Sequence, residues 1–129
     1  MLRAYGNYFE KQIGDYQSVS SPRNPTVLAL AQEIPNRGWR PDARYFLARN
    51  MYEMIIRPYR SVKRTRTIGS QLDIWPLVQE DLLDVISLSE KIAESRGRGY
   101  VSSTSVLIAL GEMAENLRTS SLQIWGPET

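Results

Sequence analysis

Apolar residues recur at helical spacing through the second half of the chain, and this pattern constrains the fold more than any other feature. One stripe runs from Val78 to Ala93 and another from Val106 to Leu117, with apolar residues mostly three or four positions apart. That spacing gathers the apolar side chains on one face of an α-helix. The two stripes predict helices over residues 74–96 and 103–118.

The first half contains further helix signals. Asn24 is a suitable N-cap because its short polar side chain can accept hydrogen bonds from the first turn, and Pro25 fits the first helical position. Pro58 lacks an N–H and clashes with the preceding turn, so we expect it to end or kink a helix near Arg57. The helices predicted in this half span residues 2–16, 25–34 and 41–57. Trp39 and Trp75, each close to a helix start, are expected in the core.

These elements predict an all-α protein with an N-terminal helical arm followed by a compact four-helix bundle. A chain of 129 residues fits one domain with a real core. We assign residues 1–23 to the helical arm and linker, 24–118 to the bundle and 119–129 to a C-terminal tail.

The composition narrows the chemistry. The chain has neither cysteine nor histidine, so disulfides, His-dependent triads and Cys/His zinc sites are excluded. It has no Gly-rich phosphate loop, and the closely spaced carboxylates between Glu80 and Glu94 are interpreted as a solvated face. We therefore predict a protein that is not an enzyme and that uses no cofactor and no metal.

No apolar run is long enough to span a membrane. The first seven residues lack the apolar run of a signal peptide, so we do not expect secretion by that route.

Residues 37–66 carry the clearest chemical signal, with nine of the sixteen Lys and Arg residues of the chain. On a helix, Phe46 and Leu47 fall on an apolar side, whereas Tyr45, Arg49 and Tyr52 fall on the opposite side. Cations neutralise phosphates, and flat rings can lie on sugars or bases. The candidate nucleic-acid-binding residues are Arg44, Arg49, Arg57, Arg60, Lys63, Arg64, Tyr45, Tyr52 and Tyr59, with Arg3 and Lys11 from the arm.

Two other interpretations of this segment stay open. An Arg/Tyr face is often simply solvated or paired with acidic residues of the same fold, and it can also bind an acidic protein partner.

The charge is divided unevenly along the chain. Residues 1–66 hold twelve basic and five acidic residues (+7), and residues 67–129 hold four and nine (−5), which sum to +2. Identical subunits could therefore meet basic half to acidic half, an arrangement that builds open arrays. We expect other copies of the chain, or a paralogous subunit, as partners. The candidate subunit-interface residues are Tyr5, Phe9, Leu122, Ile124 and Trp125.

The order of features resembles the major coat proteins of filamentous and rod-shaped archaeal viruses. The resemblance rests on the aromatic arm from Leu2 to Tyr16, the run Asn24-Pro25-Thr26-Val27 and the helices that follow. It implies subunits that pair, wrap helical N-terminal segments around double-stranded DNA and stack into a filament. The strongest basic segment here is central, however, so either the arm or residues 37–66 would contact the nucleic acid.

We therefore expect a structural protein that packages nucleic acid, a self-assembling coat (capsid) subunit of a filamentous virion that binds the phosphate backbone independently of sequence. It would be found in the virion, or in the host cytoplasm before assembly. The alternatives are a small helical adaptor that binds only protein and a dimeric DNA-binding regulator. The residues themselves fit single- or double-stranded nucleic acid equally well.

Overall fold

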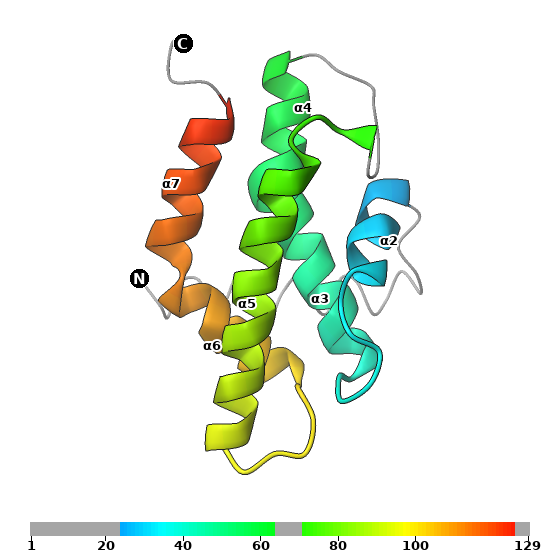
Figure 1. Ribbon diagram of the computed structural model, residues 1–129, viewed down its shortest axis with the longest axis vertical. Coiled ribbons are helices and arrows are strands. Elements are labelled where there is room, and N and C mark those ends of the chain that lie inside the picture. The colour runs from blue at the N-terminus through cyan, green and yellow to red at the C-terminus, as the bar shows by residue number, and fades with distance from the viewer. Residues whose placement is uncertain (1–23, 64–70, 126–129) are drawn as a thin grey trace.

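The computed structural model describes residues 24–63 and 71–125, and for residues 121–125 it describes the backbone alone. Its helices are α2 (Pro25–Gln32), α3 (Pro41–Met51), the π-helical turn η1 (Tyr52–Ile56), α4 (Arg57–Lys63), α5 (Trp75–Ser95), α6 (Ser103–Glu112) and α7 (Ala114–Trp125). Figure 1 shows α5 lying alongside the long helix formed by α3 and α4, with α2 on one flank and α7 on the other. The predicted all-α class is confirmed, and the arrangement is close to the expected four-helix bundle.

The start of α2 follows the sequence signal. The Asn24 side chain accepts hydrogen bonds from the backbone N–H groups of Thr26 (2.9 Å) and Val27 (3.3 Å), which satisfies donors that a helix start leaves unpaired. The helix ends at Gln32, two residues before the predicted end, because the N–H groups of the next two residues reach back only three positions.

The helix that begins at Pro41 passes through Pro58, so of the two expected effects of this proline the helix end is wrong, and the irregularity present is the π-helical turn directly before it. The Arg57 N–H donates to the Tyr52 carbonyl, five residues back, so the turn is wider than an α-helical turn. We attribute the continuity to this wider turn, which gives the proline ring room and absorbs the missing hydrogen bond within the helix. Residues 59–63, which lie beyond the predicted helix end at residue 57, therefore extend the helix.

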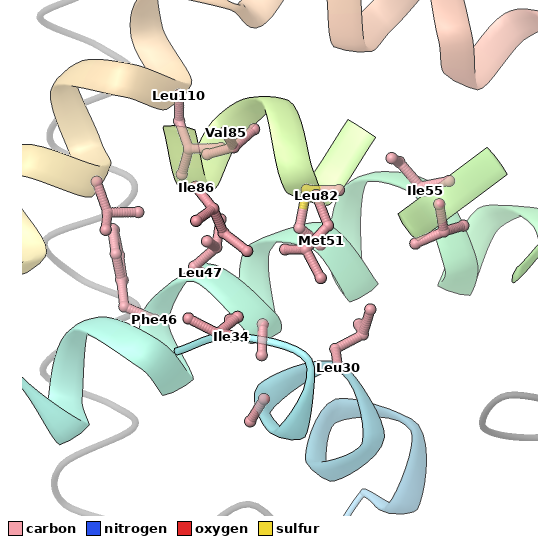
Figure 2. Close-up of a cluster of buried hydrophobic side chains, with 14 of the residues drawn as sticks. Leu30, Ile34, Phe46, Leu47, Met51, Ile55, Leu82, Val85, Ile86 and Leu110 are labelled. Atoms are coloured by element: carbon pink, nitrogen blue, oxygen red, sulfur yellow. The ribbon is translucent and has the colours of Figure 1, made fainter. Parts of the chain in front are cut away.

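The core lies where α2, α3 and η1 meet α5 and α6 (Figure 2). Leu47 and Met51 from α3 and Leu82 from α5 are almost completely buried, as are Leu30 and Leu110. Most of the predicted stripe of α5 is buried in this cluster. Trp39 and Trp75 are also buried, as expected from their places next to helix starts.

The last predicted helix is bent and longer than expected. Met113 leaves helical geometry (φ −98°, ψ 6°), so the expected single helix over 103–118 is divided into α6 and α7. The helix α7 then continues to Trp125 and packs against α4, η1 and α5. Residues 119–125, which we assigned to a C-terminal tail, therefore lie in this helix. The continuation of the helix past Pro58 provides α4, one of the surfaces against which α7 packs.

Two loops at one end of the bundle are joined by their backbones. The Arg40 N–H donates to the Val101 carbonyl (3.0 Å) and the Val101 N–H to the Gly38 carbonyl (2.7 Å). Gly38 has a φ of +79° and Gly97 a φ of +71°, a region that favours glycine because it has no Cβ. Each glycine thus turns its loop toward the other.

Candidate nucleic-acid interface

One side of the α3–η1–α4 helix carries four of the predicted cations, of which Arg57 and Lys63 are exposed and Arg49 and Arg60 half-buried. We call Arg49, Arg57, Arg60 and Lys63, with Tyr45 and Tyr52, the cationic stripe. The last cation lies fourteen positions after the first, so the stripe is about 21 Å long at 1.5 Å per residue. Figure 1 shows the helix as one nearly continuous rod. The stripe is continuous only because the helix does not end at Pro58.

Glu53 lies between two of these cations and links them. Its Oε1 accepts a hydrogen bond from Arg49 Nε (3.3 Å) and its Oε2 one from Arg57 Nη1 (2.8 Å). The Glu53 side chain is only 16% exposed, whereas that of Arg57 is 68% exposed. The carboxylate therefore holds both guanidinium groups on the stripe while it cancels part of their charge.

The two tyrosines of the stripe are half-buried against the core. The Tyr52 hydroxyl accepts a hydrogen bond of 3.4 Å from Arg60 Nη1, and Arg60 Nε is buried without a partner. Arg60 is therefore packed along the helix surface, with its position set by the tyrosine. A fixed Arg–Tyr pair of this kind presents a charge and a ring edge together.

Arg44 lies off the stripe and acts within the fold. It donates hydrogen bonds to the Ala31 carbonyl near the end of α2 (2.8 Å) and to Asn36 Oδ1 (3.0 Å). A cation at the C-terminal end of a helix satisfies carbonyls that have no partner in the helix. The structure therefore gives Arg44 a role in holding α2 against α3, which differs from the phosphate contact predicted for it.

Tyr59 is also placed in the fold instead of on the surface. Its ring is 6% exposed, and its hydroxyl donates a 2.6 Å hydrogen bond to Oδ1 of Asp73, an exposed residue. That hydrogen bond, then burial, then the charge of Asp73 raise the pKa of Tyr59 to about 12. A buried ring cannot lie on a sugar, so the prediction for Tyr59 is corrected.

The remaining predicted residues lie wholly or partly outside what the structure describes. Arg3, Lys11, Arg64, Tyr5 and Phe9 fall outside the described residues. The backbone of Leu122, Ile124 and Trp125 belongs to α7, and their side chains are not described.

The carboxylates of α5 are mostly exposed, as expected for a solvated face. Glu80, Asp84 and Glu94 are exposed, and Asp81 is half-buried with a 3.3 Å hydrogen bond from Ser120 Oγ. Burial raises the pKa of Asp81, the Ser120 hydroxyl lowers it, and the nearby acidic residues raise it further. Among the residues that the structure describes, no group of three or more acidic, histidine or cysteine side chains could hold a metal ion.

In the same described part of the chain, no helix combines the length and the apolar composition needed to cross a bilayer.

Sequence reasoning missed two features. The first is the pairing of Glu53 with both Arg49 and Arg57. Their spacing of four residues could have predicted it, because residues four apart lie side by side on a helix. The other feature is the contact of the Arg40 guanidinium with the Tyr100 ring, 5.8 Å from its centroid, between loops that the sequence does not bring together. The Gly97-Arg98-Gly99 run follows the end of α5, and the Arg98 N–H donates to the Ala93 carbonyl.

No protein-family model, no curated protein and no solved structure matches this chain.

Proposed function

We propose that this chain is a structural protein that self-associates along a nucleic acid and contacts the phosphate backbone through the cationic stripe. The observation that carries the proposal is the placement of Arg49, Arg57, Arg60 and Lys63 along one side of a single helix. A stripe of about 21 Å matches the axial rise of roughly six nucleotides of one DNA strand.

The cationic stripe is better suited to contact the sugar–phosphate backbone of a nucleic acid than to contact the edges of its bases. Arg49 and Arg57 are held by Glu53, and Arg60 lies along the helix surface, so their reach away from the helix is limited. Reading bases in a groove requires side chains that extend to the base edges. The fixed cations instead support binding that is independent of sequence and sensitive to salt.

The most specific form of the proposal is a coat subunit of a filamentous virus particle that packages double-stranded DNA. It joins the stripe to the uneven charge of the two halves of the chain, which favours head-to-tail contacts between copies. In this form the protein resides in the virion, or in the host cytoplasm before assembly, and its role is structural, not catalytic.

The test compares two double variants that each remove two positive charges. Arg57→Gln with Lys63→Gln changes the stripe, whereas Lys91→Gln with Arg118→Gln changes exposed cations elsewhere. Affinity for a short DNA duplex is measured by fluorescence anisotropy over a salt series. Losing two phosphate contacts should reduce the slope of log affinity against log salt by about 1.8. The control pair should leave the slope nearly unchanged.

The cationic stripe is not the binding surface if the two double variants reduce the salt slope equally. The same conclusion follows if the wild-type affinity does not change with salt. Electron microscopy with and without DNA then tests assembly directly. A discrete dimer that ignores nucleic acid at low salt would instead favour a helical protein-binding adaptor.

A further inference from the structure

One side of α5 carries apolar side chains that the bundle leaves in water. Leu83 is 62% exposed and Leu77 is 52% exposed, the largest values for bulky hydrophobic side chains in the described part of the chain. At 100° per residue, Glu80 and Asp84 fall between them, and all four lie within about 120° around the helix. We call Leu77, Glu80, Leu83 and Asp84 the α5 outer face.

This face combines apolar area with negative charge. Burying two leucines by docking favours association, and the two carboxylates select a partner surface that is basic. The one cation on the same side of α5, Lys91, lies almost two turns beyond Asp84. The N-terminal half of the face is therefore uniformly acidic.

The loops joined at the Gly38–Val101 hydrogen bond carry the complementary chemistry. Arg37, Arg40 and Arg98 are exposed there, and Tyr100 is 40% exposed. We call these four residues the loop pair. Tyrosine and arginine are the residue types that most often dominate the energy of protein interfaces. Backbone hydrogen bonds and the Arg40–Tyr100 contact already hold the two loops in place. Docking would therefore cost little conformational entropy.

The acidic side chains near the loop pair do not cancel all of its positive charge. Arg40 Nε is 3.3 Å from Asp42 Oδ1, and Glu90 accepts a hydrogen bond from the Trp39 indole N–H (3.1 Å). Arg37 and Arg98, on the two different loops, add two further positive charges.

The two surfaces face different ends of the molecule. The loop after α5 lies at the lower end in Figure 1, and the N-terminal half of α5 lies toward the upper end. Residues 80 and 97 are separated by about 25 Å along the helix axis. A contact between two different surfaces of identical subunits is heterologous, so it joins the copies head to tail in a ring or an open array instead of a two-fold dimer.

We propose that the loop pair of one copy of this chain docks on the α5 outer face of the next copy, with Tyr100 against the two leucines and the arginines opposite Glu80 and Asp84. This inference rests on the self-association in the proposed function and names its surfaces. It involves none of the residues of the cationic stripe, which would stay available to nucleic acid.

Charge reversal on each side gives the main experiment. The first variant carries Glu80→Arg and Asp84→Arg, and the second carries Arg37→Glu and Arg98→Glu. Each variant alone should place like charges at every contact and stay monomeric in sedimentation velocity at concentrations where the wild type associates. Mixed in equal amounts, the two should recover association as alternating chains, because each remaining contact again joins opposite charges.

A matched control carries Glu112→Arg and Glu115→Arg, which are exposed acidic positions on other helices, and it should associate like the wild type. Circular dichroism checks that all variants are folded. The proposal is overturned if the wild type stays monomeric at hundreds of micromolar, if either reversed variant associates like the wild type, or if mixing restores nothing.

A second variant without a charge change separates this inference from nucleic-acid binding. Leu77→Ser with Leu83→Ser should weaken self-association about tenfold or more, while the affinity for a duplex too short to hold two copies stays at the wild-type value. Unchanged self-association would overturn the docking surface and leave the cationic stripe standing. Lost duplex binding in the Arg57/Lys63 variant with intact self-association would support the assignment of nucleic-acid binding and self-association to two separate surfaces.

Discussion

Replacing Glu53 with glutamine should strengthen nucleic-acid binding while slightly weakening the fold. The carboxylate holds Arg49 and Arg57 at 3.3 and 2.8 Å, and a phosphate that approaches these cations must also approach Glu53. Two like charges 4 Å apart repel by about 1 kcal/mol in water. Removing the negative charge should therefore raise the affinity for a DNA duplex about fivefold at low salt.

The cost to the fold follows from the same contacts. Exposed pairs four residues apart on a helix contribute about 0.3–0.5 kcal/mol each, so losing both costs up to about 1 kcal/mol. For a chain of this size the midpoint of thermal unfolding should fall by about 2–5 °C. Opposite signs for the effects on stability and on binding are the distinctive part of the prediction.

The assay is duplex binding by anisotropy over a salt series, with thermal unfolding followed by circular dichroism. Glu115→Gln is the matched control, because Glu115 also pairs with an arginine, Arg118 at 3.0 Å, but lies on α7 away from the stripe. The reasoning is refuted if the two glutamine variants raise affinity equally, which would assign the effect to net charge alone. It is also refuted if the Glu53 variant binds more weakly than the wild type.

Two further predictions concern the pKa shifts. Tyr59→Phe removes the hydrogen bond to exposed Asp73 and should lower the free energy of unfolding by about 1.5 kcal/mol in denaturant titrations. Because the pKa of Tyr59 is raised from 10.0 to about 12, this difference should be fully present below pH 10.0 and be lost progressively as the pH rises from there through about 12. Asp81→Asn should raise the free energy of unfolding at pH 7 by less than about 1 kcal/mol, because a carboxyl with a raised pKa is destabilising when charged. That gain should shrink as the pH falls and Asp81 becomes protonated in the wild type, and a larger gain at acidic pH would contradict the assignment.

Much of the fold could be predicted because its strongest signals are local. The stripe of α5 and the Asn24 cap depend on residues within a few positions of one another, and both have the predicted location. The burial of Trp39 and Trp75 followed from their places beside helix starts.

The errors arose where distant packing overrides a local preference. Pro58 ends helices in general, but burial of Ile55, Ile56 and Tyr59 stabilises the helix on both sides of it, and a wider turn resolves the clash. The bend at Met113 places α7 against α4, a contact that no local pattern contains.

The candidate interface was predicted in outline and not in detail. Arg49 and Arg57 lie within the predicted helix, whereas Arg60 and Lys63 join the stripe only because the helix continues past Pro58. The loss of Arg44 and Tyr59 from the stripe could not be foreseen. Arg44 donates a hydrogen bond to the Ala31 carbonyl and Tyr59 donates one to Asp73, and only folding brings these partners together.

The backbone contact between the loops at residues 38–40 and 101 also affects the order of folding. Most helix contacts here join residues close in sequence, but this contact closes a long segment of chain, and Trp39 reaches Glu90 across 51 residues. Contacts between distant residues carry a larger loop-closure entropy, so they tend to form after local helices. Hydrogen exchange at the Arg40 and Val101 amides should therefore report when α5 and α6 have joined α2 and α3. The loops that we propose as a docking surface would be completed last, which would keep nascent chains from associating before they fold.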